Sequence, residues 1–211
     1  QVIGDNNFGG GIYITGNSNV NITNSKIKSN SINTGNGGGI AANSFSGDVV
    51  IDNCDIEDNL SNGSSGGGGG YVNGGSGSIF TLINSTITGN STTAWSGKGG
   101  GFLLKYCSAS IIENCIFSSN NATGSSSHGG GLALESAGSA IIKNSQFYNN
   151  SSGRGGGIHS DISTPTIENC LIYNNSGSNQ NQGGPGSNLD LLSGTTFIYN
   201  TTIVNGSINA W

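Results

Sequence analysis

Ionisable side chains that could perform chemistry are few in this chain, and the densest group is a set of carboxylates in one short segment. The segment contains Asp52, Asp55, Glu57 and Asp58. Carboxylate oxygens are the ligands that Ca²⁺ takes, and carboxylates beside a basic side chain could cleave a polysaccharide. Asp55 and Glu57 also stand one repeat after Lys26 and Lys28 at matching positions, so pairing of opposite charges on adjacent strands explains them structurally. We expect this pairing, with a calcium site as the alternative.

Two histidines and the only arginine are the remaining candidates for acid–base or metal chemistry. His128 precedes a run of glycines, His159 follows the next run, and Arg154 stands just before that run. None has a carboxylate or cysteine at a recurring ligand spacing, so we expect solvated loop residues. The sequence therefore predicts no catalytic residue and no cofactor.

The four cysteines favour packing over chemistry. Cys54, Cys115 and Cys170 share one small position of a repeated motif on alternate copies, which would place the nearest pair about 9.6 Å apart if adjacent copies stack at strand spacing. A disulfide needs Cα atoms within about 7 Å. We expect buried thiols, with a bridge that involves Cys107 as the alternative.

Composition narrows the class of protein. Charged residues make up 8% of the chain, against roughly 25% in ordinary globular proteins, and the net charge is −5 with six basic residues. Phosphate binding needs clustered Lys and Arg, so we expect no nucleic-acid partner. No run approaches the roughly 20 apolar residues of a membrane-spanning helix, so we expect no membrane span.

Runs of three glycines, each followed by a large apolar residue, recur every 26 to 31 residues. They are Gly9–Gly11, Gly37–Gly39, Gly68–Gly70, Gly99–Gly101, Gly129–Gly131 and Gly155–Gly157. A fixed period of this length predicts a solenoid in which each repeat forms one stacked coil. Apolar residues alternate within each repeat, as in Val49-x-Ile51 and Leu132-x-Leu134, which predicts short strands with one buried face. We expect a single all-β domain over residues 1–211, with about seven coils of about 30 residues each.

A second motif, apolar-x-Asn-small-x-apolar-x-x-Asn, occurs seven times, with a degenerate last copy. Its first asparagine is Asn24, Asn53, Asn84, Asn114, Asn144, Asn169 or Asn200. Stacked coils would place these side chains about 4.8 Å apart in one column. An amide both donates and accepts, and Asn tolerates left-handed backbone at a bend. We expect this column to be an inward asparagine ladder, followed by an inward position with room only for Ser, Cys or Thr.

These motifs resemble the repeats of chlamydial polymorphic outer-membrane proteins, which pair a Gly-Gly-small-apolar motif with Phe-x-x-Asn. Phe117–Asn120 and Phe147–Asn150 match the second motif, whereas the first has Gly where that family has Ala. The resemblance covers nearly the whole chain. It implies a single-stranded right-handed parallel β-helix of the pectin-lyase-like superfamily, a fold that hosts adhesins, lyases and fibres alike.

The function that we expect is an extracellular, cell-surface β-solenoid that is structural or adhesive and not an enzyme. Neither end of the repeat array has a recognisable cap, so we expect either a segment of a longer solenoid or open edges that pair end to end with identical subunits in a filament. The alternative is a β-helix that binds or cleaves carbohydrate, with Trp95 in a contact surface for glycans. Ice binding is less favoured, because the outward column from Lys26 to Thr202 is irregular.

Overall fold

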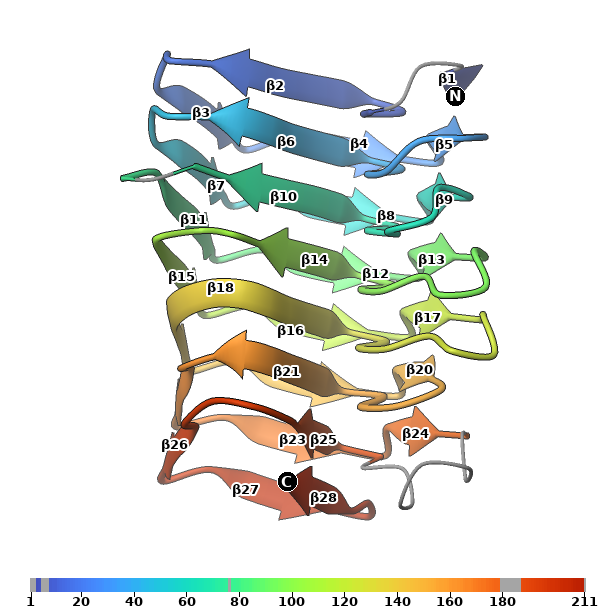
Figure 1. Ribbon diagram of the computed structural model, residues 1–211, viewed down its shortest axis with the longest axis vertical. Helices are drawn as coiled ribbons and strands as arrows, with labels where there is room; N and C mark the ends of the chain where they lie inside the picture. Colours follow the sequence, from blue (N-terminus) through green and yellow to red (C-terminus); the bar gives the residue numbers. More distant parts are fainter. Residues whose placement is uncertain (1–2, 5–7, 76, 179–186, 211) are drawn as a thin grey trace.

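The computed structural model describes residues 3–4, 8–75, 77–178 and 187–210, and within them the chain is a stack of β-coils with no helix. Figure 1 shows the coils one above another, with the N-terminus near one end of the stack and the C-terminus near the other. Every strand pairs in parallel with its counterpart in the adjacent coil, for example Ile79–Ile83 with Ala109–Glu113 in register. The predicted all-β parallel solenoid is confirmed.

Each coil contributes short strands to four faces of the stack, two of which belong to one 14-stranded sheet that bends at β18. Face 1 follows the glycine runs and contains β2 (Ile12–Gly16), β6 (Ile40–Phe45), β10 (Gly70–Gly74), β14 (Phe102–Lys105), the start of β18 (Leu132–Lys143), β21 (Ile158–Ser163), β25 (Leu189–Leu191) and β28 (Ile208–Ala210). Face 2 contains β3 (Val20–Thr23), β7 (Val49–Asp52), β11 (Ile79–Ile83), β15 (Ala109–Glu113), the end of β18, β22 (Thr166–Glu168) and β26 (Phe197–Tyr199).

The other two faces are separate seven-stranded sheets. Face 3 contains β4 (Lys26–Lys28), β8 (Asp55–Glu57), β12 (Thr86–Thr88), β16 (Ile116–Ser118), β19 (Gln146–Tyr148), β23 (Leu171–Tyr173) and β27 (Thr202–Val204). Face 4 contains the two-residue strands β1 (Ile3–Gly4), β5 (Ser31–Ile32), β9 (Leu60–Ser61), β13 (Ser91–Thr92), β17 (Asn121–Ala122), β20 (Ser151–Ser152) and β24 (Ser176–Gly177).

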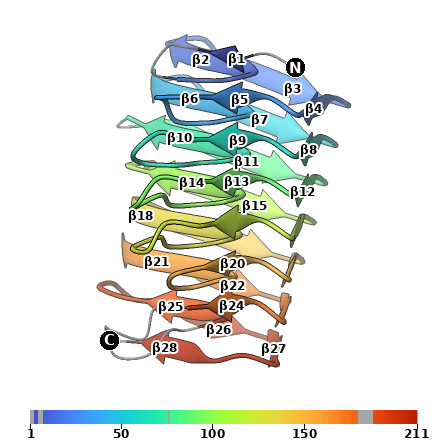
Figure 2. The same cartoon turned by 90° about the vertical axis from the view of Figure 1, so that its right-hand side faces the viewer.

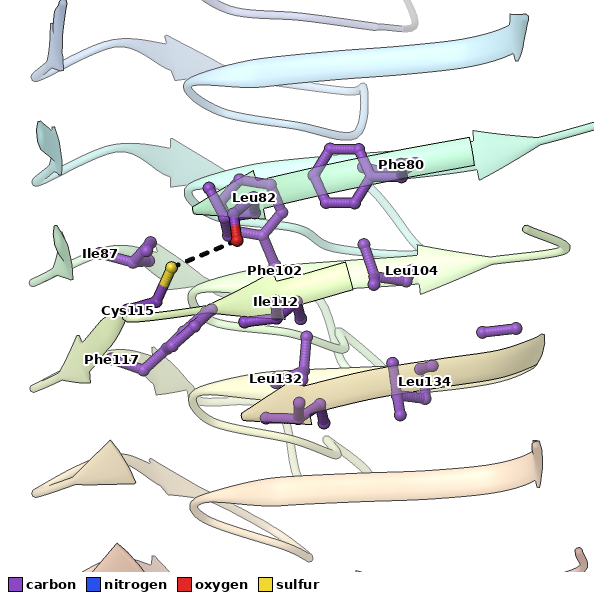
Figure 3. Close-up of a cluster of buried hydrophobic side chains, with 14 of the residues drawn as sticks. Phe80, Leu82, Ile87, Phe102, Leu104, Ile112, Cys115, Phe117, Leu132 and Leu134 are labelled. Atoms are coloured by element: carbon purple, nitrogen blue, oxygen red, sulfur yellow. Dashed lines mark hydrogen bonds between the residues drawn. The ribbon is translucent and has the colours of Figure 1, made fainter. Parts of the chain in front are cut away.

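The inner core is a continuous column of apolar side chains inside the coils (Figure 3). Phenylalanines from successive coils contact one another, with the rings of Phe117 and Phe147 stacked at 4.7 Å and that of Phe102 edge-on to Phe117. All three are fully buried. Each such side chain contributes about 1.5–3 kcal/mol by leaving water, so the core rather than any single contact holds the coils together.

The glycine runs form tight turns, as expected, but the register of the third run differs from the prediction. Gly67 adopts φ 72°, like Gly37 and Gly99, and it begins the structural triplet. Gly70 then pairs with Ile40 and Phe102, so Tyr71 aligns with Ala41 and Leu103 on the outer side of face 1. A Cβ on Gly70 would overlap the ring of Phe102. The Phe102 ring therefore fills the space that a side chain at position 70 would occupy. Residues 66–70 are all glycine, so the sequence alone could not show which three of them form the turn.

The predicted asparagine column lies at the bend between faces 2 and 3, but its side chains are exposed, so the expected inward ladder is wrong for these residues. All seven adopt left-handed backbone with φ between 45° and 54°, as expected for Asn at such a bend: Asn24, Asn53, Asn84, Asn114, Asn144, Asn169 and Asn200. Some of them form bonds along the surface, such as the 2.6 Å bond from Asn53 Nδ2 to Asn24 Oδ1. A left-handed residue interrupts the alternation of inward and outward side chains along the chain. The sequence pattern therefore did not show whether these asparagines point into the coil or out of it.

The interior ladder consists instead of the second asparagine of the motif. Its members are Asn30, Asn59, Asn90, Asn120, Asn150 and Asn175, continued by Asn188. In each link the amide Nδ2 and the backbone N–H of one residue donate to the Oδ1 of the next, as from Asn90 to Asn120 at 3.0 and 3.1 Å. In the degenerate last copy Gly206 takes the ladder position, and the amide of Asn188 occupies the space that a side chain there would need.

The small position after the exposed column faces inward, as predicted. Cys54 N–H donates to Ser85 Oγ at 3.0 Å, and Cys115 N–H donates to Ser145 Oγ at 3.1 Å, so cysteine and hydroxyl residues alternate along the stack. All four cysteines are buried free thiols, including Cys107, and the alternative of a bridge is not realised. Burial raises the pKa of the Cys115 thiol to about 12, so it packs as a neutral group.

A second packed region, called here the outer layer, lies between the outer side of face 1 and the turns that precede the glycines. The residues before the glycines form isolated parallel bridges, such as Lys98 with His128 and His128 with Arg154. Toward the N-terminal end the layer is apolar, with Ala41, Tyr71, Leu103, Ala133 and Phe8. Toward the C-terminal end it is charged.

Candidate functional site

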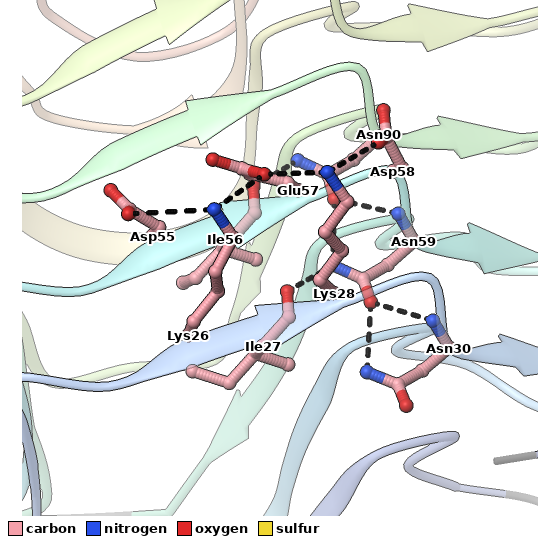
Figure 4. Close-up of polar contacts among 10 residues, drawn as sticks. All are labelled: Lys26, Ile27, Lys28, Asn30, Asp55, Ile56, Glu57, Asp58, Asn59 and Asn90. Carbon is pink, nitrogen blue, oxygen red and sulfur yellow. Dashed lines mark hydrogen bonds and ion pairs between the residues drawn. The ribbon is translucent and has the colours of Figure 1, made fainter. Parts of the chain in front are cut away.

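Three of the four predicted carboxylates, those of Asp55, Glu57 and Asp58, lie on or just after the face 3 strand β8 and meet two lysines of the preceding coil (Figure 4). The fourth, Asp52, lies on face 2, where its Oδ1 accepts a hydrogen bond from Asn84 Nδ2 at 2.8 Å. Glu57 Oε2 lies 3.1 Å from Lys26 Nζ and 3.0 Å from Lys28 Nζ, and Asp58 lies 3.4 Å from Lys28. The hydrogen bond from Lys28 lowers the pKa of Glu57, so this carboxylate remains ionised and paired. The expected pairing between strands is confirmed.

The described residues offer no cluster of side chains that would support the alternative of a calcium site. Among residues 3–4, 8–75, 77–178 and 187–210, no three His, Cys, Asp or Glu side chains gather closely enough to hold a metal ion. A hollow of about 280 Å³ beside the bend is lined by Asn24, Ser25, Lys26, Asn53 and Asp55, a mixture of amide and opposite charges.

Trp95 lies in the turn after β13 with 71% of its surface exposed. Its turn contacts the equivalent turn of the next coil, because Ser126 N–H donates to the Trp95 carbonyl at 3.0 Å. A Cβ on Gly124 would collide with the same carbonyl, so the two turns lie in direct backbone contact. Since Gly124 lines a neighbouring hollow, the turn that bears the Trp95 ring adjoins the edge of that hollow.

The hollow beside the Trp95 turn, called here the face 4 hollow, has a volume of about 270 Å³ and contains no ionisable side chain. Its lining consists of Asn121, Ala122, Thr123, Gly124, Ser151, Ser152, Gly153, Ser176 and Ser178. Ser151 Oγ donates to Asn121 Oδ1 at 2.9 Å, which orients the amide. An exposed indole on the adjoining turn and the uncharged hydroxyl and amide groups of the hollow together offer apolar contact and hydrogen bonds, the combination that suits a neutral polar ligand.

His128, His159 and Arg154 do not lie in solvated loops, and that expectation is wrong. They gather at the C-terminal end of the outer layer around Asp190, which is fully buried. Arg154 Nη2 donates to Asp190 Oδ1 at 2.9 Å, and His159 Nδ1 lies 2.8 Å from Asp190 Oδ2. Asn209 Nδ2 also donates to Asp190 Oδ1, and the His128 ring stacks on His159 at 4.4 Å.

A sequence signal for this cluster existed. Lys98, His128 and Arg154 each stand immediately before a glycine run, so they share one repeat position and stack on successive coils. His159 and Asp190 share the position of Ala133 on face 1, and they pair in register. Side chains on the outer side of face 1 are covered by the turn that precedes the glycine run. The sequence did not show that this turn folds over them.

Asp190 and His128 have strongly shifted pKa values in this cluster. Burial alone would raise the pKa of Asp190, but the hydrogen bond and charge of His159 and the hydrogen bond of Arg154 outweigh it and lower that pKa to about 2. Burial, assisted by the charges of His159, Lys98 and Arg154, lowers the pKa of His128 to about 3. With Asp190 at 0% and His159 at 1% exposure, these groups hold the coil together and do not meet a substrate in this conformation.

Comparison with known proteins places the fold. A family model for the right-handed β-helix region matches residues 10–211, and the chain therefore belongs to the right-handed β-helix family. Searches of curated proteins and of solved structures found no significant match. No helix in the described part of the chain is long and apolar enough to cross a membrane.

Proposed function

We propose that this chain is a non-catalytic, extracellular β-solenoid that makes adhesive contacts at a cell surface through Trp95 and the face 4 hollow. The observation that carries the proposal is a large exposed indole on a turn whose backbone contacts the edge of a hollow lined by uncharged groups. Exposed aromatic side chains are typical anchors of binding surfaces, because one ring supplies much contact area at low entropic cost. Uncharged hydroxyl and amide groups next to it suit a glycan surface.

The positions of the ionisable groups support a binding role rather than catalysis. The carboxylates of face 3 are paired with Lys26 and Lys28, and the Asp190 cluster is sealed beneath the turns. The face 4 hollow contains hydroxyl and amide groups without a base in its lining. An activated nucleophile needs such a base within hydrogen-bond reach.

Binding of the purified chain to immobilised neutral glycans tests the proposal. We expect saturable binding that Trp95→Ala reduces at least tenfold, since a central aromatic anchor contributes about 2 kcal/mol or more. Tyr106→Ala is the matched control, because Tyr106 is also an exposed aromatic residue but lies at the corner between faces 1 and 2. Equal binding by wild type and Trp95→Ala would contradict the assigned surface.

End-to-end association is a second candidate, favoured by the last coil of the stack. Ile198 occupies an inward position equivalent to Ile167, yet it is 37% exposed where Ile167 is fully buried. Ile208 of the same coil is also exposed, and Ile203 is only partly buried. We propose that an identical subunit stacks on this coil in a filament, where it would cover these side chains and pair with the strand edge.

Electron microscopy at increasing protein concentration distinguishes this candidate. We expect filaments that Ile203→Lys abolishes and that Ile162→Lys leaves intact, because Ile162 is exposed on the side of the coil and not at its end. Dispersed particles at every concentration would rule out the filament while leaving the glycan test unaffected.

A further inference from the structure

Two tyrosines of adjacent coils lie side by side on the outer side of face 3. Tyr148 of β19 and Tyr173 of β23 are paired in register, and their neighbours Phe147 and Ile172 point into the inner core. The two tyrosine rings are stacked, with centroids 5.1 Å apart and planes inclined by 15°. Figure 2 shows β4, β8, β12 and β27 in this order along one side of the stack, and β16, β19 and β23 lie between β12 and β27.

No other two tyrosines are stacked on each other in the described part of the chain. The remaining four contact a phenylalanine or a lysine instead, in the pairs Tyr13–Phe8, Tyr71–Phe8, Tyr199–Phe197 and Tyr106–Lys105. Aromatic stacking across two strands explains how Tyr148 and Tyr173 are held. It also places two phenol rings where a single bond between them would join two coils.

Other side chains that react with oxidants are scarce or enclosed. The chain has no methionine, and its four cysteines are buried free thiols. Burial raises the pKa of all four thiols, and the thiolate is the form that oxidants attack. The oxidisable side chains at the surface of the described residues are therefore aromatic, and among the tyrosines only Tyr148 and Tyr173 have a second phenol in contact.

We propose that Tyr148 and Tyr173 form a modification site, at which a one-electron oxidant, a peroxidase with hydrogen peroxide, joins the two rings as dityrosine. Each phenol gives up one electron and its hydroxyl proton and becomes a phenoxyl radical. The two radicals couple through a carbon–carbon bond between one Cε of each ring, and the hydrogen on each bonded Cε then moves to the phenol oxygen. The two electrons and two protons reduce one hydrogen peroxide to two waters, so the protein loses two hydrogen atoms.

The arrangement of the two strands favours coupling within the chain. Both rings are partly exposed, and surface side chains change rotamer within nanoseconds, so a small rotation brings facing Cε atoms together. The pairing of β19 with β23 holds the rings at an effective concentration on the order of millimolar. At micromolar protein this favours the bridge over coupling between two chains by roughly a thousandfold.

The bridge would act as a permanent staple between two coils. It closes a loop of about 25 residues, which restricts the unfolded chain, so Tm should rise by about 5 °C or more. Thiols do not break a carbon–carbon bond, in contrast to a disulfide. The site lies on face 3, so the staple is independent of glycan binding at Trp95 and of filament growth.

Peroxidase treatment of the intact chain at micromolar concentration tests the proposal. Unfolding the product and cleaving it after Asp and Glu places Tyr148, Tyr173 and Tyr199 in separate peptides, so mass spectrometry identifies the joined pair. We expect a monomer that has lost two hydrogen atoms, shows dityrosine fluorescence and yields the Tyr148 peptide bonded to the Tyr173 peptide. Oxidation of Trp95 adds oxygen and raises the mass, so the two reactions are told apart.

Phenylalanine variants separate this site from general oxidation. Tyr148→Phe and Tyr173→Phe each keep a stacked ring but lack one phenol, so the bridge and the rise in Tm should be lost in both. Tyr106→Phe and Tyr199→Phe are the matched controls, since they remove phenols that are 56% and 51% exposed, and both should form the bridge. An unbridged wild-type chain, a bridge that survives Tyr148→Phe, or products linked only between chains would overturn the proposal.

Discussion

The inner core and the outer layer lie on opposite sides of the same face 1 strands, yet they are filled by different rules. The inner core is apolar in every coil, from Ile14 to Leu191. The outer layer is apolar around Tyr71 and Leu103 but ionic around Arg154 and Asp190. The backbone of the glycine turns is similar at both ends, since Gly37 and Gly155 are both left-handed. The turn geometry thus defines the space, and either apolar side chains or an ion pair such as Arg154 with Asp190 can fill it.

The largest effect that we expect comes from breaking the ionic half of the outer layer. Asp190→Ala leaves Arg154 and His159 buried without their shared carboxylate, which should lower the free energy of unfolding by about 3–5 kcal/mol. Urea unfolding followed by circular dichroism measures this loss.

A combined variant sharpens the same comparison. Arg154→Met, His159→Leu and Asp190→Leu together imitate the apolar half, and replacing a whole buried ion group by packed apolar residues is often neutral. We expect this variant to recover most of the stability that Asp190→Ala loses. A combined variant that is less stable than the single one would show that the two halves are not interchangeable.

The next largest loss of stability is expected on removing an asparagine of the interior ladder, compared with one of the exposed asparagine column. Asn120→Ala removes the donor to Ile87 O and Asn150 Oδ1 and the acceptor of Asn90, so we expect a loss of about 1–3 kcal/mol for each buried group left unsatisfied. Asn114→Gly is the matched control, because Asn114 is exposed and glycine adopts its φ of 54° without strain. Thermal unfolding of both variants checks the difference, and equal losses would contradict the assignment of the ladder.

Acid should unfold the charged half of the outer layer first. The folded pKa of His128 is lowered to about 3, so the unfolded chain binds this proton first. This group therefore leaves the free energy of unfolding unchanged above about pH 6.5. As pH falls from there toward about 3, the free energy of unfolding decreases by up to roughly 1.4 kcal/mol per pH unit. Asp190, with its pKa lowered to about 2, adds a further loss below about pH 4.

His128→Phe isolates the first of these two titrations. The ring still stacks on His159, but the proton uptake is removed, so unfolding between about pH 6 and pH 4 should depend less on pH than in wild type. Unfolding midpoints across this range, measured for both chains, provide the test. An unchanged slope would place the titration elsewhere.

The smallest effect is expected on the exposed ion pairs of face 3. Glu57→Gln removes the contacts to Lys26 and Lys28, but surface pairs contribute little, so Tm should fall by about 2 °C or less. The shift should disappear in high salt, unlike the loss in Asp190→Ala. A large, salt-independent shift would mean that these carboxylates have a role beyond pairing.

Sequence periodicity was sufficient for the fold because each coil repeats the same pattern of apolar, small and glycine residues. Alternation such as Val49-x-Ile51 assigned the core, and the pairing of Lys28 with Glu57 followed from their equal repeat positions. The candidate site was harder. Trp95 could be singled out as an aromatic residue in a variable turn, but its contact with the turn of Gly124 depends on how two adjacent turns stack.

The amino-acid sequence by itself determined that the chain is a parallel β-solenoid with an asparagine ladder, because these features depend on period and residue type. The tertiary structure alone decided which asparagine column is buried, where Gly70 falls in register, and that His159 and Asp190 are enclosed. The physical reason is that left-handed residues at corners interrupt alternation. Burial outside the coil also depends on the turn that folds over it, which no local pattern specifies.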